Sequence, residues 1–490
     1  GGGGAHEPTA LVVILDNSPS SGAVTEGRVA LDRLRAAART SLARTTAADR
    51  VWLILADGVV RGGSRDALLG SLDSAAPGWQ RLDLVTTVER AARLVHAEPL
   101  PGREVHVLSD LQRTALAEGR AAPPPGVRVL ALAPGRPAVN RGIGGIRVAV
   151  GVGGGAGGAV VTVTGTTGAE PVPVTLRIRG RDVARGLGAS GTAVTLALPG
   201  QRPGWWAGEA VLDPDELRAD DRRPFVWRVA PPARVTAGAA AGPFVVAALA
   251  VLRDAQRVAD GRDVTVGDAP TSGRSVVQPP ADPALVGQGN RALAARGVPW
   301  RWVPGGGGTP GPIVATDLEM IAGVQVTQRY RLESTGDVAG QDEGVLATVN
   351  GEPWLVRAGN VVLLGSRLDT TWTALPAASG FVPFVDALVN RVSAGEAEVA
   401  QAAGAPGVEF QVRGADTIGA TVFGPDPRES DLAPATPAVA REALGADVLD
   451  DAAFAAERFA GTRRADASGV LLVLALLLAA AELGVATLTR

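Results

Sequence analysis

Apolar runs of strand length alternate with helical stripes between residues 10 and 136. The run at residues 10–15 is wholly apolar, as in a central parallel strand whose two faces are covered by helices. Further strand candidates lie at residues 50–56, 104–108 and 127–132. Stripes with helical spacing begin at Leu31 and Leu84. These repeated strand–helix units predict a doubly wound, mostly parallel sheet over residues 10–136.

The pattern changes after this region, which predicts an α/β multidomain chain. Short β-branched runs separated by glycine predict an immunoglobulin-like β-sandwich over residues 139–230, in which Asp220–Arg223 forms a solvated turn. A second alternation of strands and helices predicts another α/β domain over residues 233–395. A small β-rich segment at residues 405–465 follows, and a Gly-rich tail occupies residues 1–9.

The carboxyl end carries an apolar run at residues 467–488, in which only Glu482 is charged. Spanning a bilayer needs about 20 such residues, so the run predicts a transmembrane helix. A buried core helix is the alternative, because Glu482 would be costly in lipid unless it is paired. The chain opens with Gly1 rather than Met, so we expect a fragment or a processed form.

Composition excludes several kinds of chemistry. With 46% hydrophobic and 20% charged residues, the chain of 490 residues can bury large cores and is not intrinsically disordered. A net charge of −3 argues against nucleic acid as a partner. The absence of cysteine rules out disulfides, thiolate zinc sites and cysteine nucleophiles, and three histidines leave little room for a catalytic triad.

Three oxygen donors follow the first apolar run at alternate positions: Asp16, Ser18 and Ser20. Ligands bind beyond the carboxyl ends of the strands in open α/β sheets, and Asp110 follows another strand at the same edge. Carboxylate and hydroxyl oxygens suit Mg²⁺ or Mn²⁺ and suit zinc poorly. The alternative is an Asx or Ser turn that caps the next helix without a metal.

The Asp-x-Ser-x-Ser loop, together with Asp110 in Val-Leu-Ser-Asp-Leu-Gln, resembles the metal-ion-dependent adhesion site of von Willebrand factor A domains. The resemblance implies four metal ligands: Asp16, Ser18, Ser20 and Asp110. It also implies a Thr from a second loop. Leu82 stands at that place, and Thr86 lies one turn further on. If Leu82 takes the ligand position, water can replace one oxygen, since Mg²⁺ habitually keeps several waters.

Two later runs resemble BatA-type aerotolerance membrane proteins: Gly365 to Pro376, with Gly380 to Val385 after it, and Asp426 to Leu432. The resemblance implies that residues 233–395 have a class I amidotransferase-like fold, here without that activity because cysteine is absent. It further implies a bacterial inner-membrane protein with extracytoplasmic domains and two membrane helices before Gly1. The implied partners are a MoxR-type ATPase and other von Willebrand A proteins in an envelope-stress complex.

These observations lead to a functional prediction. We expect a membrane-anchored, non-enzymatic binding or assembly protein, in which a carboxylate of a protein partner replaces a water on the bound cation. Two alternatives remain. One is a purely structural subunit with an empty metal site. The other is a metal-dependent hydrolase, for which the chain offers no suitable histidine base.

Overall fold

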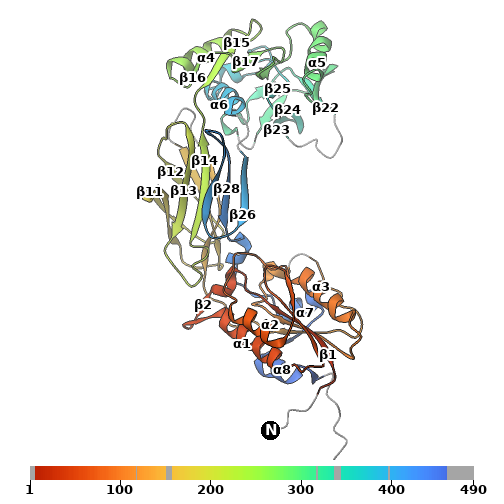
Figure 1. Ribbon diagram of the computed structural model, residues 1–490. Coiled ribbons are helices and arrows are strands. Elements are labelled where there is room, and N and C mark those ends of the chain that lie inside the picture. Colours follow the sequence, from red (N-terminus) through yellow and green to blue (C-terminus); the bar gives the residue numbers. More distant parts are fainter. Residues whose placement is uncertain are drawn as a thin grey trace, which may run out of the picture.

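The computed structural model describes residues 6–116, 119–149, 157–315, 318–335, 344–394 and 398–460. It consists of three units arranged one after another (Figure 1). The first unit contains the amino-terminal sheet, the middle unit is built of strands, and the third unit contains the large sheet of residues 233–394.

The first unit is a six-stranded sheet in the order β29-β7-β6-β1-β4-β5, parallel except for β5. Its strands are β1 (Thr9–Leu15), β4 (Arg50–Ile54), β5 (Val60–Gly62), β6 (Gly102–Leu108), β7 (Arg128–Leu132) and β29 (Asp447–Leu449), with a small hairpin of β2 (Val24–Thr25) and β3 (Arg28–Val29) beside it. Its helices are α1 (Ala30–Ala43), α2 (Arg65–Asp73), α3 (Leu84–His96), α7 (Pro437–Leu444) and α8 (Asp451–Glu457).

The central strand β1 explains why the first run of the sequence is apolar throughout. Its alternate side chains enter two separate cores, because successive residues of a strand point to opposite faces of the sheet. Leu11 and Val13 pack with α1, α2 and α8, whereas Val12 and Ile14 pack with α3 and α7. Helices therefore cover both faces of the sheet, and its carboxyl edge remains for polar loops.

The segment predicted at residues 405–465 is divided between two units. Its first part belongs to the sheet β26-β28-β27, which lies beside the sandwich (Figure 1). Its last part returns to the first unit, where β29 extends the sheet and α7 and α8 cover opposite faces. The sequence pattern does not reveal this return, because a three-residue strand carries too little periodicity to indicate its partner.

The middle unit packs a four-stranded sheet, β11-β10-β13-β14, on a three-stranded sheet, β12-β9-β8. Its strands and those beside it are β8 (Arg141–Ala149), β9 (Gly157–Gly165), β10 (Val172–Ile178), β11 (Arg181–Gly188), β12 (Ala193–Leu198), β13 (Gly204–Leu212), β14 (Arg222–Val229), β26 (Glu398–Ala403), β27 (Gly407–Arg413) and β28 (Asp416–Gly424). Trp205 of β13 joins the two parts, since its Nε1 donates to the carbonyl of Thr417 at 2.9 Å.

The third unit is a nine-stranded sheet in the order β16-β15-β17-β18-β25-β24-β23-β20-β21, parallel from β16 to β25 and antiparallel beyond. These strands are β15 (Ala233–Ala237), β16 (Val258–Asp260), β17 (Val264–Gly267), β18 (Arg274–Val277), β20 (Gly311–Val314), β21 (Gln325–Val326), β23 (Val345–Val349), β24 (Glu352–Ala358) and β25 (Val361–Leu364). One face packs against α4 (Pro243–Asp254) and α6 (Phe381–Ala394), and the other against α5 (Val286–Ala294) and the pair β19 (Trp300–Gly307) and β22 (Tyr330–Ser334).

The fold class predicted from the sequence is wrong in two respects. The described residues form 29 strands and eight α-helices, so the chain is strand-rich rather than α/β overall. The β-branched runs of residues 139–230 and of the segment after residue 398 form sheets without helices, which shifts this balance.

The second correction concerns the membrane. The predicted transmembrane helix at residues 467–488 lies outside the described residues. Within the described ranges, no helix combines the length and the apolar character that a membrane crossing requires. The described residues therefore give no support to the predicted membrane anchor or to the membrane location that depended on it.

Candidate metal centre

The loop after β1 lies where two parallel strands end together. Leu15 of β1 pairs with Leu108 of β6, and the backbone N–H of Asp16 donates to the carbonyl of Leu108 at 2.9 Å. This register places Asp16 beside Ser109 and Asp110 at the carboxyl edge of the sheet. Asp16 and Ser109 are buried at this edge, whereas Asp110 is partly exposed.

The predicted ligands of this loop are buried, and their oxygen atoms lie close together. Asp16, Ser18 and Ser20 are at most 3% exposed. The hydroxyl oxygens of Ser18 and Ser20 are 3.1 Å apart. Asp16 Oδ2 accepts from the hydroxyl of Ser109 at 2.6 Å, and Oδ1 accepts from the backbone N–H of Ser18 at 3.1 Å. The second bond is the Asx turn of the alternative interpretation, but it occupies only Oδ1 and does not explain the hydroxyl pair.

Asp110 lies in the same crevice as this loop. Desolvation, followed by the nearby charge of Asp16, raises the pKa of Asp110 to about 7, while a hydrogen bond with Ser20 acts in the opposite direction. Desolvation also raises the pKa of Asp16, against hydrogen bonds from Ser109 and Ser18. Two carboxyl groups therefore share one enclosed space, in which a proton or a cation is needed to balance their charge.

A third acidic residue, Glu429, reaches this crevice from the far end of the sequence. It lies on the 3₁₀ turn η8 (Pro427–Ser430) and is 2% exposed. Its Oε2 accepts from the backbone N–H of Ser20 at 3.2 Å. Burial, and then the charges of Asp16 and Asp110, raise the pKa of Glu429 to about 8. Glu429 belongs to the run Asp426 to Leu432, but nothing local in that run indicates a partner so far away in sequence.

We call residues 426–435 the strap, because hydrogen bonds fix them across the carboxyl edge of the sheet. Three of these bonds join the strap to the loop after Asp110. The side-chain amide of Gln112 donates to the carbonyl of Glu429 at 3.2 Å, and the backbone N–H of Arg113 donates to Ala433 at 3.0 Å. The backbone N–H of Ala435 donates to the carbonyl of Leu111 at 2.8 Å. These three bonds therefore hold the strap against the loop after Asp110.

The second loop does not bring a threonine to the crevice. Leu82 is 3% exposed and packs in the core shared with α3. Thr86 is exposed on the first turn of α3, where its backbone N–H donates to Oδ1 of Asp83, the residue that caps the helix. The same loop supplies a positive charge instead, because Arg81 lies close enough to lower the pKa of Asp16.

The donors present fit a hard cation. They are carboxylate and hydroxyl oxygens, which Mg²⁺ and Mn²⁺ prefer. Ser20 and Asp110 also line a cavity of about 970 Å³ between α1, the loop after β7 and the strap. An acidic group can therefore approach the crevice from this cavity.

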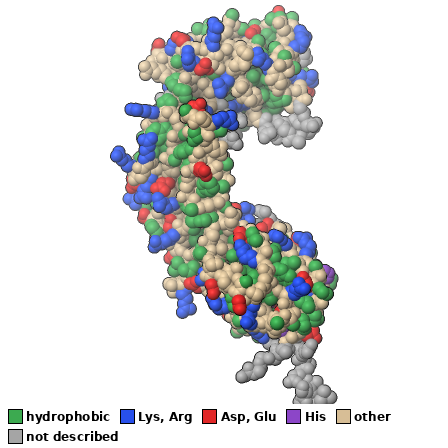
Figure 2. Space-filling model, in the orientation of Figure 1, with side chains coloured by type: hydrophobic (Ala, Val, Ile, Leu, Met, Phe, Trp, Pro, Cys, Tyr) green, Lys and Arg blue, Asp and Glu red, His purple; other side chains and the backbone are tan. Residues whose placement is uncertain are grey.

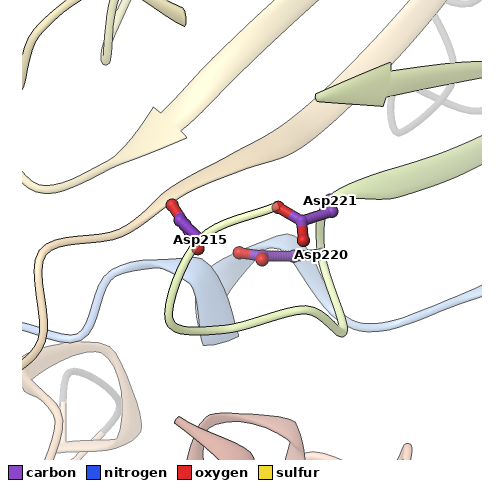
Figure 3. Close-up of side chains that lie close together, drawn as sticks. All are labelled: Asp215, Asp220 and Asp221. Carbon is purple, nitrogen blue, oxygen red and sulfur yellow. The ribbon is translucent and has the colours of Figure 1, made fainter. Parts of the chain in front are cut away.

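A second acidic group lies in the loop between β13 and β14. Asp215, Asp220 and Asp221 each offer a carboxylate oxygen within 4.8 Å of the others, so these residues could hold a metal ion (Figure 3). Asp220 and Asp221 are at most 4% exposed, and one oxygen of each has no hydrogen-bond partner in the described part of the chain. Burial raises their pKa values, to about 6 for Asp220 and to about 7 for Asp221, with the charge of Asp215 adding to both. The solvated turn expected at these positions is therefore wrong.

Comparisons with known proteins add no family assignment. No protein-family model matches the chain, and no curated protein matches it. The resemblances to von Willebrand factor A domains and to BatA-type proteins therefore stay predictions, and the expected links to aerotolerance and to a membrane receive no support.

Proposed function

We propose that the crevice at the carboxyl ends of β1 and β6 binds Mg²⁺ or Mn²⁺ and uses the cation to hold an acidic group. Asp16, Ser18, Ser20 and Asp110 are the residues that would hold the cation. The observation that carries the proposal is that the Ser109 hydroxyl contacts both the Asp16 and the Asp110 carboxyl groups, at 2.6 and 3.4 Å, beside the Ser18–Ser20 hydroxyl pair.

Coordination is the chemistry that this arrangement supports. A divalent cation would offset the charges of the carboxylates, and Mg²⁺ keeps several waters that an incoming carboxylate can replace. The residues would fix the position of the cation through the hydrogen bonds that orient Asp16. A protein partner with an exposed Asp or Glu fits this chemistry, and a MoxR-type ATPase is the candidate that the resemblance names.

Binding is favoured over hydrolysis by the positions of the histidines. The His106 ring lies between Ser41 and Glu104 in the core, and burial lowers its pKa. The His6 ring contacts Asp49, and His96 is exposed at the end of α3. None of these contacts places an imidazole beside Asp16 or Asp110, where metal-assisted hydrolysis would need a base.

The charge distribution supports a role for the cation in recognising an acidic group. Figure 2 shows charged side chains of both signs spread over the visible face of all three units. On the face in view, positive and negative side chains are interspersed over the unit that contains the crevice. A bound cation would supply a concentrated positive charge at one defined point.

Calorimetric titration with Mg²⁺ and Mn²⁺ tests the proposal. All proteins would carry Asp221→Asn, so that the Asp215, Asp220 and Asp221 group does not contribute. We expect Asp16→Ala to weaken cation binding at least tenfold. The matched control is Asp66→Ala, a residue of α2 whose side chain is 88% exposed, and it should bind as the parent does. Equal affinities for Asp16→Ala and the parent would contradict the proposal.

A further inference from the structure

We propose that Asp215, Asp220 and Asp221 form a second cation site, which takes Ca²⁺ and fastens the sandwich to the first unit and the strap. The three residues belong to the loop between β13 and β14 and share no residue with the crevice. The inference is therefore independent of the proposed function, and either one can fail without the other.

The spacing of the carboxylate oxygens is the first support. One oxygen of each aspartate lies within 4.8 Å of the other two. Figure 3 shows the side chains of Asp220 and Asp221 pointing to the same side, toward Asp215. Oxygens on opposite sides of a Ca²⁺ ion stand about 4.8 Å apart, twice a Ca–O distance of about 2.4 Å. One ion can therefore contact all three carboxylates.

Buried oxygens without partners are the second support, and one of them lies outside the aspartate group. Asn140 is fully buried, and its Nδ2 donates to Oδ2 of Asp220 at 2.8 Å. Its Oδ1 therefore stands within about 5 Å of that carboxylate oxygen, because the O and N atoms of an amide are about 2.2 Å apart. Among the described residues, Oδ1 of Asn140 has no hydrogen-bond partner, and neither has Oδ1 of Asp220 or of Asp221. Such atoms are rare in folded proteins, and a bound ion accounts for them.

Gly142 of β8 leaves the space that this arrangement needs. A Cβ at this position would stand 2.1 Å from Oδ2 of Asp220 and 2.5 Å from the hydroxyl oxygen of Ser430, too close for any real contact. The two side chains therefore lie against the same point of the β8 backbone. Because Ser430 is 1% exposed, the strap brings a further buried oxygen next to Asp220.

The basic residues near the aspartates balance only part of their charge. Nε of Arg141 is 3.7 Å from Oδ2 of Asp215. The fields of Arg218 and Arg223 also reach the group, but neither forms an ion pair with it in the described part of the chain. A buried carboxylate is costly unless it is paired or coordinates a metal. The remaining negative charge is therefore left for a cation to balance.

The kind of donors and their spacing favour Ca²⁺ over Mg²⁺. Ca²⁺ accepts six to eight carboxylate, carbonyl and water oxygens in a flexible geometry, whereas Mg²⁺ demands a near-ideal octahedron in which opposite oxygens stand about 4.1 Å apart. Asp215 also lines a cavity of about 650 Å³ between this loop and the first unit. The ion and its remaining waters can reach the aspartates from this cavity.

The loop that carries the site also contacts the first unit and the strap. The backbone N–H of Val24 donates to the carbonyl of Glu216 at 2.9 Å. Leu217 packs against Ala23 of the first unit and Leu432 of the strap. A cation that orders this loop would therefore hold the junction of the first unit, the sandwich and the strap in one arrangement.

Calorimetric titration with Ca²⁺ tests the inference in the full chain. Every protein carries Asp16→Ala, so that the crevice does not contribute. We expect this chain to bind Ca²⁺ at least tenfold more tightly than Mg²⁺. Adding Asp221→Asn should weaken Ca²⁺ binding at least tenfold, and adding Asn140→Ala at least threefold. The matched control is Asp213→Asn, at an exposed position of the same loop, which should leave the affinity unchanged.

The outcomes separate this site from the crevice. If the Asp16→Ala chain does not bind Ca²⁺, or if Asp221→Asn leaves its affinity unchanged, the inference is refuted. The proposed function is then unaffected, because its own test uses chains in which Asp221→Asn has removed this site. Tighter binding of Mg²⁺ than of Ca²⁺ would overturn the assignment to calcium, and an unchanged affinity in Asn140→Ala would refute the role of Asn140.

Hydrogen exchange covers the case in which Asp221→Asn or Asn140→Ala does not fold. In the Asp16→Ala chain, Ca²⁺ should slow the exchange of backbone amides at least fivefold in residues 213–221 and in the strap. Exchange in α5, which lies in the third unit, should stay the same and serves as the internal control. Unchanged rates in the loop and the strap would overturn the inference.

Discussion

The backbone N–H of Ser20 donates to the carboxylate of Glu429 at 3.2 Å, although the two residues are 409 positions apart in sequence. This contact joins the loop of the first strand to a segment that arrives only after two other units have been built. The amino-terminal sheet is thus completed by the carboxyl-terminal part of the chain. We therefore expect the amino-terminal sheet to be less stable when the carboxyl-terminal part of the chain packs against it less well.

Phe454 of α8 provides a direct measure of this dependence. It is 2% exposed and packs edge-on against His106, with ring centroids 5.5 Å apart. We expect Phe454→Ala to lower the free energy of unfolding of the first unit by about 3–5 kcal/mol, the usual cost of such a cavity. Urea denaturation measures the change. The control Phe244→Ala, at a residue of α4 that is 36% exposed, should cost under about 1 kcal/mol. Equal effects of the two substitutions would contradict the expectation that the packing of α8 stabilises the first unit.

The acidic crevice should make stability depend on pH in the absence of divalent cations. Burial raises the pKa of Asp110 to about 7 and that of Glu429 to about 8, whereas both would titrate near 4 in the unfolded chain. Between these values the folded protein binds more protons than the unfolded chain, so the free energy of unfolding falls as pH rises. The loss should extend from about pH 4 to pH 8 and end once both folded groups are ionised.

Urea unfolding in EDTA at pH 6.5 and 8.5 tests this dependence, with Asp221→Asn in every protein compared so that the raised pKa of Asp221 does not contribute. Burial lowers the pKa of His106, so its titration changes stability in the direction opposite to that expected for the two carboxyl groups. We expect the free energy of unfolding of the parent to be lower at pH 8.5 than at pH 6.5. The double variant Asp110→Asn, Glu429→Gln should show a smaller decrease. Added Mg²⁺ should reduce the loss in the parent. A parent that is equally stable at both pH values would refute the prediction.

Asp221 allows a separate test in the sandwich. Its buried carboxyl group has a raised pKa of about 7 through burial and the charges of Asp215 and Asp220. At pH 8.5 in EDTA, we expect Asp221→Asn to raise the free energy of unfolding by about 1 kcal/mol, because a buried charge near like charges is removed. Asp213→Asn, at an exposed position of the same loop, is the matched control and should have little effect. If Asp221→Asn instead lowers the free energy of unfolding, the ionised Asp221 carboxylate stabilises the folded protein, and the prediction is wrong.

The elements of the first sheet could be predicted where the sequence carries a long pattern. The apolar run of β1 and the polar residues after it indicate a buried strand with a functional edge, and the parallel pairing with β6 places Asp110 beside Asp16. Periodicity identifies such elements because it depends only on neighbouring residues.

The rest of the site could not be predicted, because it depends on contacts between distant segments. Glu429 has no local signal that points to Ser20, and β29 is three residues long. Asp220 and Asp221 precede two arginines, a composition typical of an exposed turn. The structure buries both side chains because the loop folds between the sandwich and the strap, where Asn140 donates to the carboxylate of Asp220 at 2.8 Å.

Arg81 provides the last test, since this residue of the second loop brings a positive charge near Asp16. Its charge offsets part of the rise in the pKa of Asp16, and its buried Nε has no hydrogen-bond partner among the described residues. A cation entering the crevice would be repelled by this guanidinium. We therefore expect Arg81→Gln to strengthen Mg²⁺ and Mn²⁺ binding by about three- to tenfold, a change of up to about 1.4 kcal/mol. Calorimetry measures the affinities, with Arg65→Gln, an exposed residue of α2, as the control. Weaker cation binding by Arg81→Gln would mean that Arg81 orients the ligands, and the electrostatic account of the crevice would have to be abandoned.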